Sequence, residues 1–298
     1  MPRALVITNP AAARTKPRTV REVRDVLRRG GWQAEIIATG GPGDARRLAT
    51  EAVAAGMDAV AVFGGDGTTM QAASSLVGTD VALALIPGGT GNLLAGNLRI
   101  PLSPSRAAEV LVRGVSRRID LGRLEASGAH HYFAVACGAG FDARIMAETP
   151  STLKQRWGVG AYIATSLRLI SEIRSHLYHI RVDGVEFEAN AAVVLVANCA
   201  EVLPPILRFG PDVRPDDGFL DVVVLRADSL ADGVQAIWHF LRRAEGPDSR
   251  IGHVRGREIH VETDAAVPVE MDGDIGGLTP FTATVVPGAI RVMVPESS

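Results

Sequence analysis

The chain has 298 residues, of which 47% are hydrophobic and 21% are charged, and its formal net charge is −2. This length is enough for two domains of ordinary size, and the composition is that of a globular protein. A nearly neutral chain has no global field for nucleic acid, so we expect no nucleic-acid partner.

The cysteines and the apolar runs bear on the compartment. The two cysteines, Cys137 and Cys199, stand in apolar surroundings, which favours free buried thiols and a reducing compartment. The N-terminal apolar run is too short for a signal peptide, and no stretch reaches the roughly 18 apolar residues of a spanning helix. We therefore expect a cytoplasmic protein that meets a membrane only from its surface, as a peripheral protein at the inner face.

Strands and helices alternate through the first hundred residues. Short apolar runs predict strands, and apolar residues three or four apart predict helices. The expected strands are 4–8, 32–38, 59–63 and 81–86, and the expected helices cover 20–27, 45–53, 70–77 and 104–113. This order predicts an α/β domain with a Rossmann-like parallel sheet, in which ligands bind at the carboxyl ends of the strands.

Two of these strands run directly into glycine-rich loops. The third leads to Gly64-Gly65-Asp66-Gly67 and the fourth to Pro87-Gly-Gly-Thr-Gly-Asn92. Glycines let a ligand approach the backbone, and consecutive N–H groups at a helix N-terminus favour an anion, most often phosphate. Thr68 or Thr69 is the expected N-cap of the helix after the first loop. One glycine turn is usually only a connection, but two such units favour nucleotide binding.

The first loop carries an acidic residue, Asp66. A carboxylate repels phosphate unless a cation lies between them or the carboxylate binds a sugar hydroxyl. Neither loop continues to the Lys-Ser/Thr of a P-loop, and neither has the G-x-G-x-x-G spacing of dinucleotide sites.

Strand signals dominate after residue 115. The expected strands are 131–136, 176–183, 185–188, 191–197, 219–225, 258–262, 267–271, 281–286 and 290–294, with helices near 160–174 and 229–243. Val182-Asp-Gly-Val185 is typical of a two-residue hairpin. This pattern predicts an antiparallel β-sandwich. We place the boundary at residue 120, with domains 1–120 and 121–298, and the last strand can return to the first domain.

Gly64-Gly-Asp-Gly-Thr68 together with Gly89-Thr-Gly-Asn92 resembles the diacylglycerol kinase catalytic-domain family, in its branch of bacterial soluble lipid kinases. This branch is related to the sphingoid and ceramide kinases. NAD kinases share the first loop but not the later motifs, and are more distant relatives. The later motifs of this chain are Gly138 to Ala143, Lys154 to Tyr162, Asp217 to Asp221 and Asp272 to Asp274.

The resemblance implies a nucleotide site for ATP at the strand ends. It assigns to this site Asn9, Thr39, Gly64, Gly65, Asp66, Gly67, Thr68, Thr69, Met70, Gly89, Thr90, Gly91 and Asn92. Magnesium is the implied cofactor. Thr39, taken by itself, is equally well an ordinary turn residue.

The resemblance also implies catalytic and metal-binding carboxylates. Asp274 stands where the family has a catalytic glutamate and is the candidate general base, with Asp272 positioning the base or a magnesium ion and Asp66 facing the phosphate or its metal. Asp217 resembles a magnesium ligand that is joined by the main-chain oxygens of Arg214 and Phe219. From spacing alone, Asp272-Gly-Asp274 is also an ordinary hairpin turn and the Asp217 loop a solvated one.

The expected function is an ATP-dependent lipid kinase that phosphorylates a diacylglycerol-like acceptor bound by the β-sandwich domain. An NAD-kinase-like activity and a catalytically silent nucleotide- or lipid-binding homologue are the alternatives. Aspartate in place of glutamate at Asp274, and Leu203-Pro-Pro-Ile-Leu207 in place of a glycine-rich stretch, motivate the silent homologue. Trp157, Ile206, Leu207 and Phe209 are the expected membrane contacts, and nothing in the sequence indicates an oligomeric state.

Overall fold

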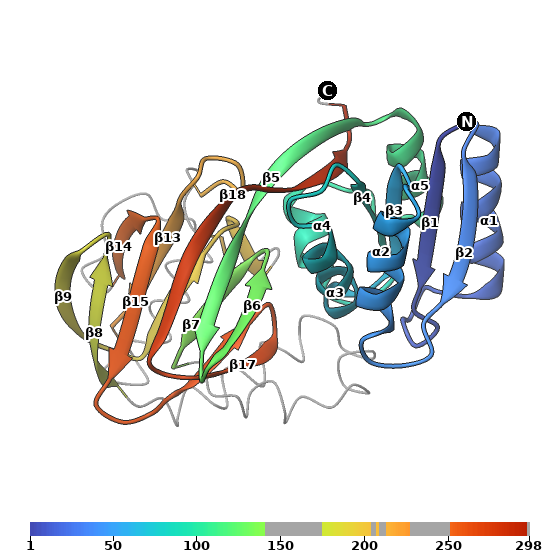
Figure 1. Ribbon diagram of the computed structural model, residues 1–298. Coiled ribbons are helices and arrows are strands. Elements are labelled where there is room, and N and C mark those ends of the chain that lie inside the picture. The colour runs from blue at the N-terminus through green and yellow to red at the C-terminus, as the bar shows by residue number, and fades with distance from the viewer. Residues whose placement is uncertain (141–174, 204–206, 209–212, 227–250, 297–298) are drawn as a thin grey trace. The chain divides into compact units, whose positions relative to one another are not determined.

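The computed structural model describes residues 1–140, 175–203, 207–208, 213–226 and 251–296 (Figure 1). The chain divides into two compact units, Met1–Asp120 with Gly288–Ser298, and Leu121–Pro287. Two strands, β5 (Val115–Ala126) and β18 (Phe281–Val294), have residues in both units. The helices expected near 160–174 and 229–243 lie outside the described residues.

The first unit is built on four parallel strands in the order β2-β1-β3-β4. β3 and β4 are buried along their whole length, as expected for apolar runs in a parallel sheet that is covered on both faces. The edge strand β2 has only exposed and half-buried residues. The bounds are β1 Arg3–Thr8, β2 Gln33–Ala38, β3 Ala59–Gly64 and β4 Ala82–Pro87.

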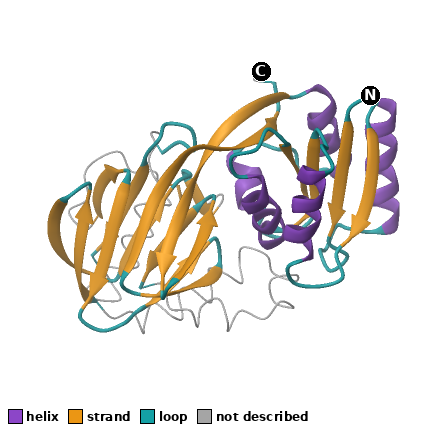
Figure 2. Cartoon of the chain, in the orientation of Figure 1, coloured by secondary structure: helices purple, strands orange, loops and turns teal. Residues whose placement is uncertain are grey.

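Helices follow each of these strands, and the last two lead from β4 to β5 (Figure 2). They are α1 Pro17–Arg29, α2 Asp44–Ala54, α3 Asp66–Leu76, α4 Leu93–Asn97 and α5 Pro104–Arg113. α1 packs against α5, and α2 packs against α3. Because crossovers are right-handed and the chain reverses direction along the sheet after β2, these pairs cover opposite faces. The α/β prediction for this half of the chain is confirmed.

The start of α3 differs from the prediction. The helix begins at Asp66, with Gly65 as an N-cap of extended backbone, and neither Thr68 nor Thr69 caps it. The expected apolar position Val77 is the C-cap. The threonines lie inside the first turn because the helix starts without a connecting residue after the glycine pair.

The second unit contains two antiparallel sheets. One has the order β14-β13-β10-β7-β16-β17. The other brings β18, β15, β8 and β9 together, with β5 beside β18 and β6 beside β5. Their residues share one apolar core, which includes Phe133, Tyr178, Val196, Val222 and Phe281. The predicted β-sandwich is confirmed. The bounds are β6 Ala129–Phe133, β7 Ala136–Ala139, β8 His176–Val182, β9 Val185–Ala191, β10 Val193–Ala197, β13 Leu220–Leu225, β14 Ile251–Gly256, β15 Glu258–Thr263, β16 Pro268–Met271 and β17 Asp274–Leu278, and a separate pair is formed by β11 Glu201–Leu203 and β12 Leu207–Arg208.

Several strand boundaries in this unit differ from the prediction. The expected strand 131–136 is divided between β6 and β7, and the two expected strands 281–286 and 290–294 are the single strand β18. β5, β11, β12, β14 and β17 were not predicted. The Asp183-Gly184 hairpin is confirmed, since Val182 pairs with Val185 and both turn residues have positive φ, 48° and 85°.

Candidate functional site

The two glycine loops lie against each other at the carboxyl ends of β3 and β4. The N–H groups of Gly88 and Gly89 donate to the carbonyl oxygen of Gly64 at 2.8 and 3.2 Å. A Cβ on Gly89 would lie 2.8 Å from the Cα of Gly65, and a Cβ on Gly88 would lie 3.2 Å from the backbone nitrogen of Gly64. Glycine is therefore required here for the contact between the loops, a reason that the sequence analysis did not consider.

Asp66 joins the first loop to the second. Its Oδ2 accepts the N–H of Asn92 and its Oδ1 accepts the N–H of Leu93, both at 2.7 Å. Burial raises the pKa of the Asp66 carboxyl above its usual value, and the hydrogen bonds from Leu93 and Asn92 oppose that rise. These backbone donors explain a carboxylate in this loop without a metal ion. The expected contact of Asp66 with phosphate or its metal stays a prediction.

The second loop is closed by Asn92. Its backbone is left-handed, with φ of 54°, and its side chain accepts the N–H of Gly89 at 3.0 Å and donates to the Gly89 carbonyl at 2.8 Å. Asn92 is buried, whereas Thr90 and Gly91 are exposed. The side chain of Asn92 therefore shapes the loop, and the exposed residues before it are the ones open to a ligand.

The other predicted nucleotide residues lie at the same edge of the sheet. Asn9 Nδ2, after β1, donates to Thr68 Oγ1 at 3.0 Å, and Thr39, after β2, donates to the Thr8 carbonyl at 3.4 Å. Gly67 is exposed in the first turn of α3, while Met70 is half-buried and Thr69 is buried, with 8% of its surface exposed. The structure thus brings Asn9, Thr39 and both loops to one edge, as expected for strand ends of a parallel sheet.

In the second unit, Asp272 and Asp274 belong to the hairpin between β16 and β17. Met271 pairs with Asp274, so Asp272 and Gly273 form a two-residue turn with φ of 48° and 90°. The candidate base Asp274 is exposed at the start of the edge strand β17.

The Asp272 carboxylate anchors this hairpin. It accepts the N–H groups of Ala134, Val135 and Ala136 at 2.7, 2.9 and 3.0 Å. This arrangement supports the expected role of positioning Asp274 and leaves the expected magnesium role without a described contact. Sequence reasoning missed residues 134–136, because a segment of apolar residues that acts through its backbone leaves no signal in residue type.

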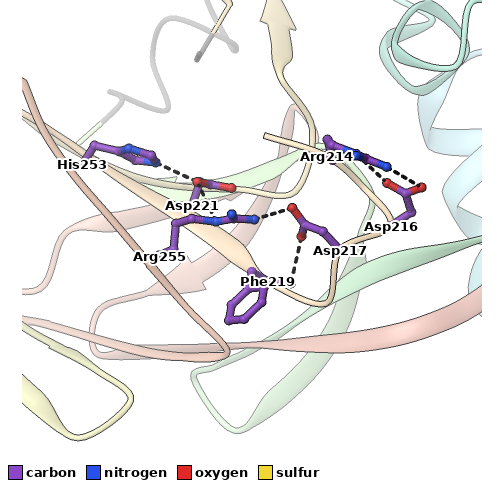
Figure 3. Close-up of polar contacts among 7 residues, drawn as sticks. All are labelled: Arg214, Asp216, Asp217, Phe219, Asp221, His253 and Arg255. Atoms are coloured by element: carbon purple, nitrogen blue, oxygen red, sulfur yellow. Dashed lines mark hydrogen bonds and ion pairs between the residues drawn. The ribbon is translucent and has the colours of Figure 1, made fainter. Parts of the chain in front are cut away.

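The predicted metal residues form a cluster of ion pairs (Figure 3). Asp217 accepts the N–H of Phe219 at 3.1 Å through Oδ1, and its Oδ2 pairs with Arg255. Arg214 pairs with Asp216 at 3.2 Å. Both oxygens of Asp217 are thus engaged, one of them by a cation of this chain. As arranged, these residues do not fit a magnesium ion at Asp217.

Two further members of this cluster were not predicted, His253 and Arg255 on β14. His253 Nε2 lies 2.7 Å from Oδ1 of the buried Asp221, and Arg255 Nε lies 3.4 Å from the same atom. The available signal was the spacing of His253 and Arg255, which places both side chains on one face of β14.

Comparison with known proteins agrees with this geometry. The family description "Diacylglycerol kinase catalytic domain" matches residues 3–124, and "YegS C-terminal NAD kinase beta sandwich-like domain" matches residues 135–294. A diacylglycerol kinase of Mycobacterium tuberculosis is 31% identical over 91% of this chain and 87% of its own length, and a Pseudomonas fluorescens protein named "Probable lipid kinase YegS-like" is 30% identical over 94% and 91%. A crystal structure of a diacylglycerol kinase from Bacillus anthracis has a TM-score of 0.77 at 26% identity, and the match covers 98% of this chain and 96% of that one. The chain therefore belongs to the diacylglycerol kinase catalytic-domain family, within the branch of YegS-like bacterial lipid kinases.

Proposed function

We propose that the protein transfers the γ-phosphoryl group of ATP to the hydroxyl of a diacylglycerol-like lipid. The observation that carries this proposal is the pair of interlocked glycine loops at the ends of β3 and β4, in a chain of this family. Gly67 and Thr90 expose the loops to a ligand, and the α3 N-terminus favours phosphate. The carboxylates of Asp66 and Asp272 accept backbone N–H groups, so magnesium would enter with the phosphates of ATP and its own waters.

Asp274 is the proposed general base. A carboxylate can accept a hydroxyl proton from a substrate that lies at hydrogen-bond distance. On the same strand, Ile275 and Leu278 expose 70% and 46% of their surface. Exposed apolar side chains beside the base suit an acceptor with acyl chains.

A lipid acceptor implies work at a membrane surface. Among the described residues, none of the helices has the length and apolar character needed to cross a bilayer. Of the expected membrane contacts, Trp157, Ile206 and Phe209 lie outside the described residues, as does the side chain of Leu207. We therefore propose peripheral binding, with flotation on liposomes of anionic and zwitterionic lipids as its test. A protein that stays with none of these liposomes, with or without ATP and magnesium, contradicts the proposal.

The decisive experiment is transfer of labelled phosphate from ATP to a panel of lipids and to NAD. The proposal expects label on a lipid hydroxyl in the parent and at least about a hundredfold slower turnover in Asp274→Asn. ATP affinity by calorimetry stays unchanged in that variant. Asp274→Glu restores the family residue and retains activity. Asp264→Asn, which alters another exposed aspartate of the same unit, is the matched control and is expected to be neutral.

The outcomes separate the three functions. Label on NAD alone points to the NAD-kinase-like alternative. This alternative is tested because the family description that matches residues 135–294 names an NAD kinase-like β-sandwich. ATP binding without transfer to any acceptor points to the silent homologue. Gly65→Val places a branched side chain in the first loop and tests, by calorimetry, whether the loops bind ATP. If the parent binds ATP and this variant binds it with unchanged affinity, the glycine loops are not the nucleotide site.

A further inference from the structure

The Arg255 guanidinium lies between the carboxylate of Asp217, in the predicted metal loop, and that of Asp221, on β13. We infer that in this chain it takes the place of a divalent cation at Asp217, so that residues 214–219 are held by a cation built into the protein. The inference goes beyond the proposed kinase activity, since it concerns a structural position and not the magnesium that accompanies ATP.

The strand register fixes this arrangement. Asp221 on β13 pairs directly with Arg255 on β14. Arg255 Nε lies 3.4 Å from Asp221 Oδ1, and its Nη2 pairs with Asp217 Oδ2. The Asp221 side chain is 2% exposed and that of Asp217 is 22% exposed. One guanidinium therefore bridges a buried carboxylate and the predicted metal ligand, as a planar fork of five donors can do.

A ring contact holds the guanidinium in the same place. The Cζ of Arg255 lies 5.0 Å from the centroid of the Phe219 ring, a cation–π distance. Phe219 also donates its N–H to the other Asp217 oxygen at 3.1 Å. Figure 3 shows the Arg255 side chain running from Asp221 to Asp217. The Asp217 carboxylate, the Phe219 ring and the Phe219 N–H therefore together hold the loop against Arg255.

Charge makes the guanidinium and a magnesium ion mutually exclusive at this position. Magnesium requires near-octahedral oxygen ligands at about 2.0–2.1 Å, and Asp217 is the only carboxylate that the prediction offered it. An ion bound to Asp217 Oδ2 would replace the Arg255 contact and bring two like charges together. It would also leave the buried Asp221 with His253 as its remaining described partner.

Arg257 provides a matched control. Its Cζ lies at the same 5.0 Å from the Phe219 ring. Among the described residues, however, it has no ion pair with Asp217 or Asp221. Arg257→Ala removes an arginine and a ring contact and leaves the bridge between the two carboxylates in place.

The test is thermal unfolding of the full chain without nucleotide or lipid, in about 10 mM magnesium chloride or in EDTA. The parent and Arg257→Ala are expected to have the same Tm in both, within about 1 °C. In Arg255→Ala, the vacated position binds magnesium, and the Tm is expected to rise by about 2–8 °C with the ion. The double variant Arg255→Ala, Asp217→Asn loses that rise.

The parent alone can overturn the inference, even if Arg255→Ala fails to fold. A magnesium-dependent rise in the parent Tm that Asp217→Asn abolishes would show that the ion, and not Arg255, occupies the position. A folded Arg255→Ala protein with no response to magnesium would also overturn it. Because no nucleotide or lipid is present, neither result bears on the proposed kinase activity.

Discussion

The contact between the two glycine loops predicts that Gly65 can be replaced by alanine and that Gly89, which faces it from the other loop, cannot. A Cβ on Gly89 would lie 2.8 Å from the Cα of Gly65, but a Cβ on Gly65 would lie 3.6 Å from the Cα of Gly89. Carbon atoms in favourable contact are about 3.5–4.0 Å apart. Gly89→Ala must therefore separate the loops by roughly 0.7 Å or more, whereas Gly65→Ala fits without movement.

The cost of Gly89→Ala follows from this separation. The Gly89 N–H to Gly64 carbonyl distance, 3.2 Å in the structure, would grow to about 3.9 Å and the hydrogen bond would be lost. Overpacking between rigid backbone segments costs about 1–3 kcal/mol. Gly65 has an extended backbone that alanine adopts readily, so Gly65→Ala is expected to be neutral within about 0.5 kcal/mol or slightly stabilising.

Urea unfolding of the two variants measures this difference. With Trp157 and Trp238 replaced by phenylalanine, the fluorescence of Trp32 reports on the first unit alone, which avoids averaging over two units. Gly89→Ala should lower the free energy of unfolding by about 1–3 kcal/mol relative to Gly65→Ala. Equal stabilities for the two variants would refute the argument that the glycines are required for contact between the loops.

Three further predictions concern carboxylates and thiols. Burial raises the pKa of Asp66 above its value in the unfolded chain, so between these two values the native state binds more protons than the unfolded state. The contribution of Asp66 to the free energy of unfolding therefore falls as the pH rises through this range. Asp66→Asn should remove this pH dependence in urea unfolding measured from pH 4 to 7. Asp272→Ala should cost about 3 kcal/mol in urea unfolding because three backbone N–H groups lose their acceptor, and an unchanged midpoint would contradict the anchor. Burial raises the pKa of the Cys137 and Cys199 thiols, so a disulfide reagent should label them at pH 8 at least tenfold faster in urea than in the native state.

The alternation of strands and helices in the first unit was predictable from local pattern. Runs such as Ala59–Gly64 are apolar throughout because both faces of the sheet are covered, and such a strand is visible in the sequence without knowledge of its partners. The Asp183-Gly184 turn was equally local, since its two residues tolerate positive φ.

The continuity of β18 was not predictable in this way. Pro287 and Gly288 are turn residues, and they led to two predicted strands instead of one. The strand continues because its partners change there. Val285 donates its N–H to the Arg257 carbonyl on one side, and Gly288 donates to Asp120 Oδ1 at 2.7 Å on the other.

The partners of the acidic residues Asp66 and Asp217 could not be predicted from the sequence either. The carboxylate of Asp66 in a glycine loop needs a partner for its charge, and the sequence suggests a cation or a sugar hydroxyl. The compensation is supplied by the N–H groups of Asn92 and Leu93, and a backbone donor is the same for every residue type except proline. The interpretation of Asp217 failed to include Arg255 for a related reason, since the two are 38 residues apart and meet only through strand pairing.

The return of β18 to the first unit makes that unit discontinuous in the sequence. Ala82 and Leu83 of β4 pair in parallel with Arg291 and Val292, which a ribosome adds roughly 200 residues later. At about 5–20 residues per second, the open edge of β4 waits on the order of 10–40 seconds for its neighbour. Through most of its synthesis, a nascent chain therefore has an apolar strand, β4, that is paired with β3 on one edge and open on the other. Any 3′ truncation of the gene leaves that edge open to pairing with another chain.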